Sequence, residues 1–423
     1  MEEQPNKDFP NGTITYSVSL GTEEYVCQSN IGMNAGFEIT PRWFPTGRPA
    51  FINPTTEKPM KASDFLGRLN LSSVLESIKE RYGKKEWHFH YPVEAMIKSQ
   101  IFKYIKGLRW DTALLNHLKQ YPTDAQMLGF EIDETGTPKL PSQQTMSHFV
   151  KTRMRQEGLY DIFDSLVMAI REEMAARGIQ LGKTIGVDST PMKSLRNDKD
   201  AAFNPHYNIK GYKIHGAVDL DHFLPLTFNF TTATDGDSPQ YLPLLDRLHM
   251  LGITFNGVYA DGAYASFENF AIVNHHYRAR TVFNLREDAK ISPLGTPAGI
   301  KKQYNLLWKC DGFKPDAGLE YMLYFLMWHQ RYDVVGAYYR NKHIKEWEKN
   351  YDATKTDYNK RAGIEAFHGH LKQQMNIEKF LDKKGIQNAE IHVLLCYISL
   401  LAVALCRLQH GITDGLVNVK CLV

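Results

Sequence analysis

Between residues 183 and 283 the chain alternates β-rich and helical runs in an order that few folds accommodate. Three strand-like runs come first, and Asp221, His222 and Phe223 separate the second from the third, which is the spacing of a hairpin. Three mostly antiparallel strands followed by strand–helix units indicate an α/β fold with a mixed sheet flanked by helices. The runs are LGKTIGVDST, GYKIHGAVDL and LPLTFNFTTAT, then the helix PQYLPLLDRLHMLG, the strand in FNGVYADGAYAS, a helix over 266–276 and the strand RTVFNL.

Two of these strands are predicted to end in an acid, Asp188 after Val187 and Asp261 after Ala260. Ligands bind at the edges of open sheets, where loops can reach them. An unpaired carboxylate in a core is strongly disfavoured, whereas one that holds a cation is not, and Mg²⁺ takes oxygen ligands. Either acid alone is better explained by a turn or a helix cap. Rival acids lie nearby, of which the last three sit in turns and are the weaker candidates: Asp198, Asp200, Asp219, Asp221, Asp235 and Asp237.

A third acid, Glu365, lies in the helical run TDYNKRAGIEAFHGHLKQQM. At about 100° per residue, Tyr358, Arg361, Glu365 and Lys372 fall on one stripe about 60° wide. A carboxylate among a guanidinium, an ammonium and a phenol suits a metal ion that grips a nucleic-acid backbone. The alternative is an ordinary surface ion pair between Arg361 and Glu365, worth about 0.2–0.5 kcal/mol.

Basic and aromatic residues are interleaved in the segment before Glu365. Residues 338–361 hold seven Lys or Arg against four acids, with five aromatic residues among them. Basic groups neutralise phosphates, and aromatic faces stack on exposed bases. We expect most of these rings to pack within the segment, with Trp347 left to stack on a base. Farther upstream, Lys210, Lys213 and His215 either line a DNA channel or lie on a strand surface.

The chain resembles the DDE transposases of bacterial and archaeal insertion sequences, in the group with a tyrosine–arginine–glutamate–lysine signature. In that signature two residues follow Tyr, three follow Arg and six follow Glu, and Tyr358, Arg361, Glu365 and Lys372 match it. The upstream elements IGVDST, GYKIH, ATDGDS and VYADGAY match as well. The runs KGLRWDTAL and PSQQTMSHF resemble, more loosely, the amino-terminal domain that often precedes this catalytic core.

The resemblance implies an RNase H-like fold in which Asp188, Asp261 and Glu365 are the catalytic metal ligands. The cofactors would be two Mg²⁺ or Mn²⁺ ions, and such ions, about 4 Å apart, promote in-line displacement at phosphorus. The resemblance also implies that the DNA-binding residues Tyr358, Arg361 and Lys372 contact the phosphates at the element's end, where a flipped base is held.

The chain divides into three expected segments. Residues 1–61, rich in Thr, Asn, Pro and Gly, are expected to form an extended or poorly ordered arm. Residues 62–180 are expected to form an all-α DNA-binding domain compatible with a helix-turn-helix. Residues 181–415 form the catalytic domain, and residues 288–350 within it form an insertion. The runs YMLYFLMW and DVVGAYY are expected to be strands, which would make that insertion β-rich.

Composition adds limits on location. Five cysteines form no CxxC pair, so a zinc ribbon is unsupported, and unpaired thiols fit a reducing cytoplasm. The opening run MEEQPNKDFP is acidic and polar, unlike a secretory signal. The apolar run from Val393 to Cys406 is too short for a membrane span and suits a buried core helix. We expect a cytoplasmic, nucleoid-associated protein with no membrane partner.

These observations together predict a DNA transposase. It would cleave phosphodiester bonds at the terminal inverted repeats of its element and join the 3′ ends to target DNA by two-metal-ion catalysis. Its partner is double-stranded DNA, and synapsis of two ends implies a homodimer or a larger complex. The alternatives are an RNase H-like nuclease without strand transfer, a non-catalytic DNA-binding protein derived from a transposase, and a metal-independent structural protein.

Overall fold

The computed structural model divides the chain into two compact units, Met1–Arg48 and Pro49–Val423. In the first unit, β1 (Thr13–Leu20) and β2 (Glu23–Asn30) pair antiparallel. This hairpin occupies part of the expected arm, and most of the remaining arm lies outside the described residues, so that expectation stays a prediction. The structure describes residues 13–20, 23–30, 60–78, 91–285, 288–308 and 317–422.

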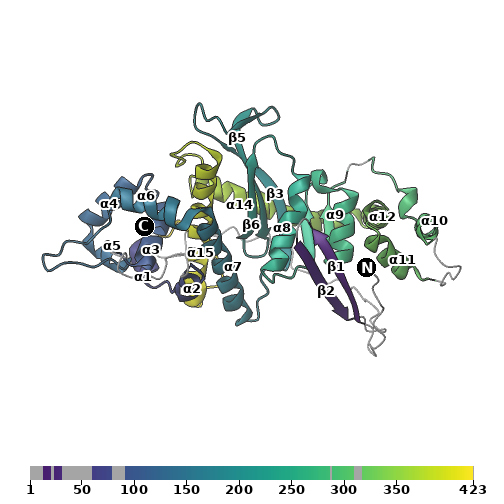
Figure 1. Ribbon diagram of the computed structural model, residues 1–423, viewed down its shortest axis with the longest axis horizontal. Coiled ribbons are helices and arrows are strands. Elements are labelled where there is room, and N and C mark those ends of the chain that lie inside the picture. The colour runs from purple at the N-terminus through teal and green to yellow at the C-terminus, as the bar shows by residue number, and fades with distance from the viewer. Residues whose placement is uncertain are drawn as a thin grey trace. The chain divides into compact units, whose positions relative to one another are not determined.

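Helices form the amino-terminal part of the second unit, as the sequence predicts (Figure 1). They are α1 (Ala62–Gly67), α2 (Ser72–Ile78), α3 (Val93–Ile105), α4 (Asp111–Gln120), α5 (Pro122–Met127), α6 (Gln143–His148), the π-helical turn η3 (Phe149–Met154) and α7 (Arg155–Ala175). Pro92 precedes α3, and Gly107 follows it with a φ of 64°, a conformation that suits glycine. The Ser142 hydroxyl caps α6 by accepting from the Thr145 amide at 3.1 Å.

A six-stranded mixed sheet forms the centre of the second unit. Its strands are β3 (Thr184–Lys193), β4 (Ala202–Asn204), β5 (Ile209–Asp219), β6 (Leu224–Thr232), β7 (Gly257–Ala260) and β8 (Arg280–Phe283). β5 pairs antiparallel with β3, β4 and β6, whereas β3, β7 and β8 run parallel to one another. The mixed sheet flanked by helices confirms the predicted fold class and is consistent with an RNase H-like fold.

Helices cover both faces of this sheet. The remaining elements near it are α8 (Ser238–Met250), η4 (Gly262–Tyr264), α9 (Phe267–Ala271), η5 (Ile272–His276), α13 (Tyr351–Tyr358), η7 (Asn359–Arg361), α14 (Ala362–Gln373) and α15 (Ile386–Gln409). Phe228 of β6 contacts the rings of Tyr160 and Phe163 on α7 and of Tyr397 on α15, so α7 and α15 lie on one face. On β6, Asn229 points the other way and bonds Gln240 of α8.

The long helix α15 lies at the centre of the core and runs beside α7 (Figure 1). Among the described residues it is the one helix whose length and composition would also suit a membrane span, but 94% of its most apolar window is buried inside the protein. The prediction of a buried core helix at Val393–Cys406 is therefore confirmed. Because α15 also packs on α3, the expected DNA-binding and catalytic segments share one core, and their separate roles stay predictions.

The insertion is helical, so the prediction of a β-rich insertion was wrong for its described residues. It contains the short 3-10 turn η6 (Pro293–Gly295) and the helices α10 (Pro297–Leu307), α11 (Leu319–Trp328) and α12 (Tyr332–Lys349). The two runs expected as strands are α11 and the start of α12. Short apolar runs do not distinguish a strand from a buried helix. Packing decides here, because Tyr304, Leu326 and Val334 of the three helices join one apolar cluster.

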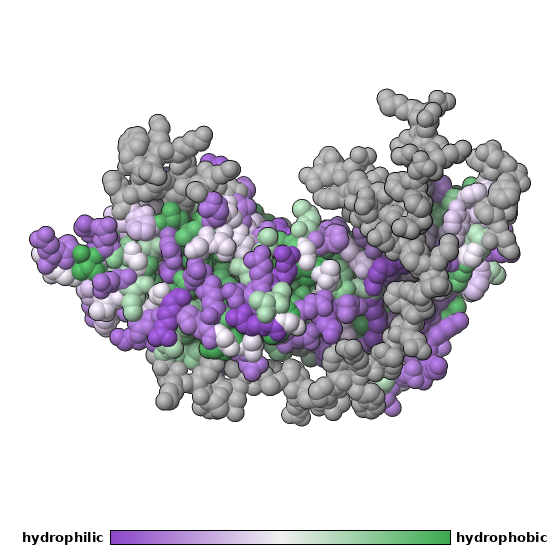
Figure 2. Space-filling view, turned by 90° about the horizontal axis from the view of Figure 1, so that it is seen from below, coloured by the Kyte–Doolittle hydropathy of each residue, from purple (hydrophilic) through white to green (hydrophobic). Residues whose placement is uncertain are grey.

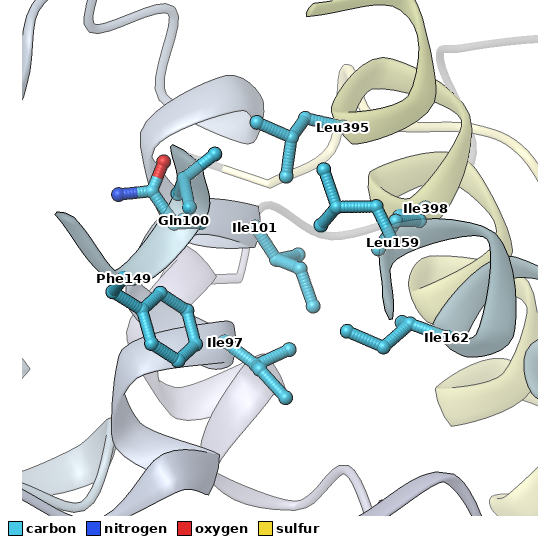
Figure 3. Close-up of a pocket in the computed structure, with 9 residues that line it drawn as sticks. Ile97, Gln100, Ile101, Phe149, Leu159, Ile162, Leu395 and Ile398 are labelled. Carbon is cyan, nitrogen blue, oxygen red and sulfur yellow. The ribbon is translucent and has the colours of Figure 1, made fainter. Parts of the chain in front are cut away.

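A small cavity lies where α3, η3, α7 and α15 meet (Figure 3). Ile101, Phe149, Ile162 and Leu395 are among its mostly apolar lining residues. Its volume is about 10 Å³, roughly the room for a single water. We therefore interpret it as a packing gap rather than a ligand site. On the surface seen in Figure 2, hydrophilic side chains predominate and apolar ones are scattered between them, as is normal.

The stability of this core depends on pH through His392 of α15. Its Nδ1 lies 2.9 Å from the Tyr104 hydroxyl and its Nε2 lies 2.7 Å from the Ile377 carbonyl oxygen. A neutral imidazole satisfies both partners, donating from Nε2 and accepting at Nδ1. Burial lowers the pKa of His392 to about 4. The unfolded state therefore takes up a proton first, and stability falls as the pH drops from about 6.5 towards that value.

We predict that His392→Gln weakens this pH dependence by about 1.4 kcal/mol per pH unit within that range, since the amide can donate and accept but does not titrate. Thermal melts at pH 7 and pH 5 measure the effect. The wild-type Tm should fall further than that of the variant. His148→Gln, at an exposed position, is the matched control and should behave as wild type. Equal falls in wild type and His392→Gln would contradict the assignment.

Candidate active site

Strands β3 and β7 bring the two aspartates to one point of the sheet. Their parallel register pairs Gly186 with Tyr259, and continuing it by two residues sets Asp188 opposite Asp261. The pairing itself ends at Gly186 and Tyr259, so the two acids lie just beyond the paired residues of these neighbouring strands. Asp261 follows β7 directly, as predicted. The prediction that Asp188 ends its strand was wrong, because β3 continues to Lys193 through its pairing with β5.

Asp188 faces α14, and two glycines of the sheet lie beside it. A Cβ built on Gly186 would lie 2.6 Å from Cδ2 of Leu220 and 3.3 Å from the Ile364 Cβ of α14, so Gly186 leaves room first for Leu220 and then for this helix against β3. Side chains two residues apart on a strand share a face, so Asp188 points to the same helix. Gly216 pairs with Asp188 from β5, and a Cβ there would lie 3.7 Å from Nε2 of His368. The helix that carries Glu365 can therefore lie close beside Asp188.

Arg361 links the acid of the sheet to the acid of the helix. Its Nη2 lies 3.3 Å from Asp188 Oδ2, and its Nη1 donates to Glu365 Oε1. The Asp188 side chain is 14% exposed and that of Glu365 is 56% exposed. The Nε of Arg361 is buried and has no hydrogen-bond partner within the described part of the chain. The guanidinium is thus a cation between two acids, and its Nε–H is a buried donor with no partner among the described residues.

Negative charge converges on Asp188. Burial raises the pKa of its carboxyl to about 6, Arg361 opposes the increase, and the carboxylates of Asp261 and Glu365 add to it. Neighbouring carboxylates that raise the pKa of a buried acid favour the binding of a cation there. The structure therefore brings together the three acids that the sequence predicts.

Tyr358 and Arg361 lie on one helical run that tightens to a 3-10 turn between α13 and α14, where both residues keep right-handed helical φ and ψ. The helix α13 ends at Tyr358, η7 carries Arg361, and α14 then begins. Asp357 anchors the connection, since its carboxylate accepts from the Tyr259 hydroxyl of β7 at 2.9 Å and pairs with Nη1 of Arg280 on β8 at 2.7 Å. This anchor holds the Tyr358–Arg361 turn over the strand that leads to Asp261.

The aromatic residues near Tyr358 form a packed group. The Trp347 ring centroid lies 6.1 Å from those of Tyr358 and Tyr351, and its Nε1 donates to Nε2 of His343 at 2.9 Å. Tyr351 is 54% exposed, whereas Trp347 is half-buried. The sequence analysis expected Trp347 to be the ring left free to stack on a base. The exposed ring of this group is instead Tyr351.

Lys372 lies farther along α14. Its Nζ is 3.9 Å from Glu378 Oε1, beyond the end of the helix. Burial lowers the pKa of Lys372, Glu378 opposes the decrease, and Lys193 at the end of β3 adds to it. Lys372 thus lies on the same helix as Glu365 but beside a different set of charges.

Two of the alternative candidate acids, Asp219 and Asp198, accept several hydrogen bonds from other groups of the protein. Asp219 accepts from three backbone N–H groups, at 2.6 to 2.9 Å. Asp198 accepts from the Tyr212 hydroxyl at 2.8 Å and from the backbone N–H of Gly385 and Asp200. Both are almost fully buried. These contacts give each acid a structural role, so neither is a candidate metal ligand.

Sequence reasoning missed the role of Asp237, which it set aside as a turn residue. Asp237 Oδ1 lies 3.1 Å from Lys213 Nζ and 3.3 Å from His215 Nδ1. Burial alone would raise the pKa of Asp237. Hydrogen bonds from His215, Ser189 and Lys213 outweigh burial and lower this pKa to about 2. Lys213 and His215 are buried, so neither lines a DNA channel. Ser189 pairs with His215 across β3 and β5, and this register could not be read from the sequence.

The three acids are not arranged around an open metal position. Across the described residues, no group of three or more His, Cys, Asp or Glu side chains is arranged as a metal site. In the present arrangement Arg361 supplies the positive charge beside Asp188 and Glu365. The donor chemistry nevertheless fits a hard divalent cation, because the three acids that act on one another are all carboxylates.

The mixed sheet carries two aspartates, and a helix packed on it carries a glutamate. Together these three acids form a candidate site for phosphoryl transfer. Residues 181–402 match the family model described as Transposase DDE domain, which is more than half of the chain. The chain therefore belongs to this family of transposases.

Two further comparisons add little. No match is found among curated proteins. Among solved structures, the chain is similar to one described as a cryo-EM structure of the piggyBac transposase synaptic complex with hairpin DNA. The identity is 10%, the TM-score is 0.29, and the match covers 85% of this chain and 83% of that one. At such a score nothing further is inferred from the likeness.

We predict that Asp188→Asn raises the Tm at pH 7 without divalent cations. The folded-state pKa of about 6 lies above the ordinary value, so ionised Asp188 destabilises the fold, by up to about 3 kcal/mol. The gain should vanish below about pH 4, where both states are protonated. Asp352→Asn, at an exposed acid, is the control and should leave the Tm unchanged. A lower Tm for Asp188→Asn would show that the Arg361 contact outweighs the desolvation.

Proposed function

We propose that this transposase cleaves phosphodiester bonds at the terminal inverted repeats of its element and joins the 3′ ends to target DNA. Asp188, Asp261 and Glu365 would hold two Mg²⁺ or Mn²⁺ ions. The observation that carries the proposal is the convergence of these three acids, from β3, the end of β7 and α14, around one arginine. The Tyr358–Lys372 signature supports placing the chain in the insertion-sequence group of bacteria and archaea.

Ions bound at these carboxylates would supply activation of a water or a 3′-hydroxyl and stabilisation of the leaving oxygen. Arg361 would prepare the site for them by changing partners. A guanidinium binds a phosphate in a bidentate manner, and its side chain is long enough to turn from an acid to a nearby phosphate. The buried Nε of Arg361, without a partner of its own, supports such an exchange. Its departure leaves Asp188 and Glu365 free to accept a different cation.

Other residues of the signature would hold the DNA. Tyr358 is half-buried beside the acids, and burial together with their charge raises the pKa of its phenol, so it stays a hydroxyl donor at neutral pH. Lys372 would neutralise a phosphate farther from the cleaved bond. Two element ends must be held together, so we propose a homodimer or larger complex on duplex DNA, acting in the cytoplasm at the nucleoid.

Alanine variants of the acids test the proposal. Asp188→Ala, Asp261→Ala and Glu365→Ala should each reduce cleavage of labelled terminal-repeat DNA in Mg²⁺ or Mn²⁺ by at least about 100-fold, because each removes a carboxylate from the metal site. The control is Asp235→Ala, a nearby acid in the turn before α8, which should cleave as wild type. Undiminished cleavage by any one of the three variants would remove that residue from the site.

A strand-transfer assay with pre-cut ends separates the rival functions. A transposase should yield products joined to target DNA, whereas a nuclease of the same fold yields none. A non-catalytic DNA-binding descendant would bind the repeats but neither cut nor join them. Binding of the repeats should be measured on the same samples by fluorescence anisotropy, so that loss of chemistry is not confused with loss of DNA binding.

Arg361→Lys tests the phosphate role of the arginine. We predict that cleavage falls about 10- to 100-fold, since a lysine keeps the charge but lacks the bidentate fork. The Tm should change little, because an ammonium can still lie near the acids. Arg340→Lys, on α12, is the matched control. Wild-type cleavage by Arg361→Lys would reduce this residue to an ion-pair partner of Glu365.

A further inference from the structure

Asp237 lies on the face of the sheet that α8 covers. It is the residue before α8, and Asn229 of β6 points to that helix and bonds it. His215 pairs with Asn229 across β5 and β6 and faces the same way. Side chains alternate between the two faces of a strand, so Ser189 points towards α8 where Asp188 points towards α14. Asp237 and the Asp188 carboxylate therefore lie on opposite sides of β3.

A buried ammonium group balances the charge of Asp237. Lys213 is almost fully buried, and its Nζ lies 3.1 Å from Asp237 Oδ1 and donates to the Asp235 backbone carbonyl at 2.9 Å. The carboxylate of Asp235 accepts from the Thr232 hydroxyl instead. Buried polar networks whose members have partners are rigid. These contacts therefore fix the carboxylate of Asp237 in one position against the sheet.

Ser189 connects this carboxylate to that of Asp188. It lies directly opposite His215 in the pairing of β3 with β5, and His215 Nδ1 is 3.3 Å from Asp237 Oδ1, so Ser189 and Asp237 are neighbours. The Ser189 hydroxyl donates to the Asp237 carboxylate. The backbone N–H of Ser189 donates to Asp188 Oδ1 at 2.9 Å. One residue thus bonds both carboxylates, one through its side chain and the other through its main chain.

Tyr264 covers this link on the side of Asp261. It follows Asp261 by three residues, is almost fully buried, and its ring centroid lies 5.4 Å from that of Tyr241 on α8. Burial raises the pKa of its phenol, and the carboxylates of Asp237, Asp188 and Asp261 add to the increase. The phenol therefore lies near all three carboxylates. Hydrogen bonds are stronger in such buried surroundings than in water.

The Ser189 bond gains importance when Arg361 changes partners. In the structure Asp188 has a partner on each oxygen, since Oδ2 lies 3.3 Å from Arg361 Nη2 and Oδ1 accepts from the Ser189 amide. If Arg361 turns to a phosphate, Oδ2 loses its partner, whereas Oδ1 keeps Ser189. The orientation of the Asp188 carboxylate would then depend on the Ser189 amide and on whatever holds Ser189 in place.

We propose that Asp237 is a positioning residue that acts through Ser189 to keep the Asp188 carboxylate oriented for a divalent cation. The identity of this ligand rests on the proposed function. Lys213 supplies the charge that holds Asp237, the Ser189 hydroxyl joins Asp237 to β3, and the Ser189 amide fixes Oδ1 of Asp188. Partners behind a metal ligand set its orientation, and their loss typically weakens metal binding about 10- to 100-fold.

Ser189→Ala tests the link, with Mn²⁺ binding to the full chain measured by electron paramagnetic resonance of the free ion, well below the Tm of each variant. The change frees β3 from Asp237, so the Mn²⁺ affinity should fall at least about tenfold. Ser189→Thr keeps the hydroxyl and should bind as wild type. Ser194→Ala is the matched control, since it removes a hydroxyl that bonds the Lys210 carbonyl beyond the end of β3. Wild-type affinity in Ser189→Ala, or equal losses in Ser189→Ala and Ser189→Thr, would overturn the proposal.

A coupling experiment separates a link through Ser189 from a general loosening of the fold. Asp237→Ala/Lys213→Met removes the acid together with its counter-charge, so no buried ammonium is left unpaired, and should weaken Mn²⁺ binding as Ser189→Ala does. Adding Ser189→Ala to this pair should cause no further loss, because both changes break the same link. Losses that multiply would show two independent effects and would count against a positioning role for Asp237.

Two further measurements keep this proposal distinct from the proposed function. Mn²⁺ binding should be lost in Asp188→Ala, and binding that survives there, or a wild type that binds no Mn²⁺, would remove both. If Ser189→Ala weakens Mn²⁺ binding while the wild type neither cuts nor joins DNA, the proposed function fails and the positioning role stands. If the wild type cuts and joins DNA but Ser189→Ala binds Mn²⁺ normally, the positioning role alone fails.

Discussion

The close approach of α14 to the sheet is the constraint on which the site depends. The three acids are far apart in the sequence, and strand register alone joins only Asp188 and Asp261. Glu365 comes near them because α14 packs against β3. At this contact Gly186 leaves room for the Leu220 side chain, 2.6 Å from a built Cβ, and for Ile364 of the helix, 3.3 Å from it. Tight interiors do not absorb an added methyl group freely, so a larger residue there would displace Leu220 and crowd the helix that carries the glutamate.

The site also depends on the balance between the carboxylates around Asp188 and the charge of Arg361. An aspartate buried beside two other carboxylates is unfavourable, and Arg361 offsets that cost within the protein itself. A site of this kind can remain folded before its substrate arrives, because it carries its own counter-charge.

Most of the strand order and the identities of the three acids could be predicted from the sequence, because alternation and motif spacing are local properties. The insertion was wrongly predicted because runs such as the one in α11 are apolar on every side, and only their packing against α10 and α12 selects a helix. The ion pair between Arg361 and Glu365, given as an alternative from the sequence, is present. The role of Asp237 and the contact of Arg361 with Asp188 could not be predicted, because both depend on residues distant in sequence.

The anchor at Asp357 has a consequence for the evolution of such chains. The helical insertion leaves the sheet after β8 and returns to it at this carboxylate, which Tyr259 and Arg280 hold in place. The helix α12 of the insertion is held as well, because it packs on α9, where a Cβ built on Gly336 would lie 1.8 Å from the Phe267 carbonyl oxygen. The chain is therefore fixed from α12 to Asp357 before Glu365 follows. Changes in the outer helices α10 and α11 can then accumulate without moving Glu365.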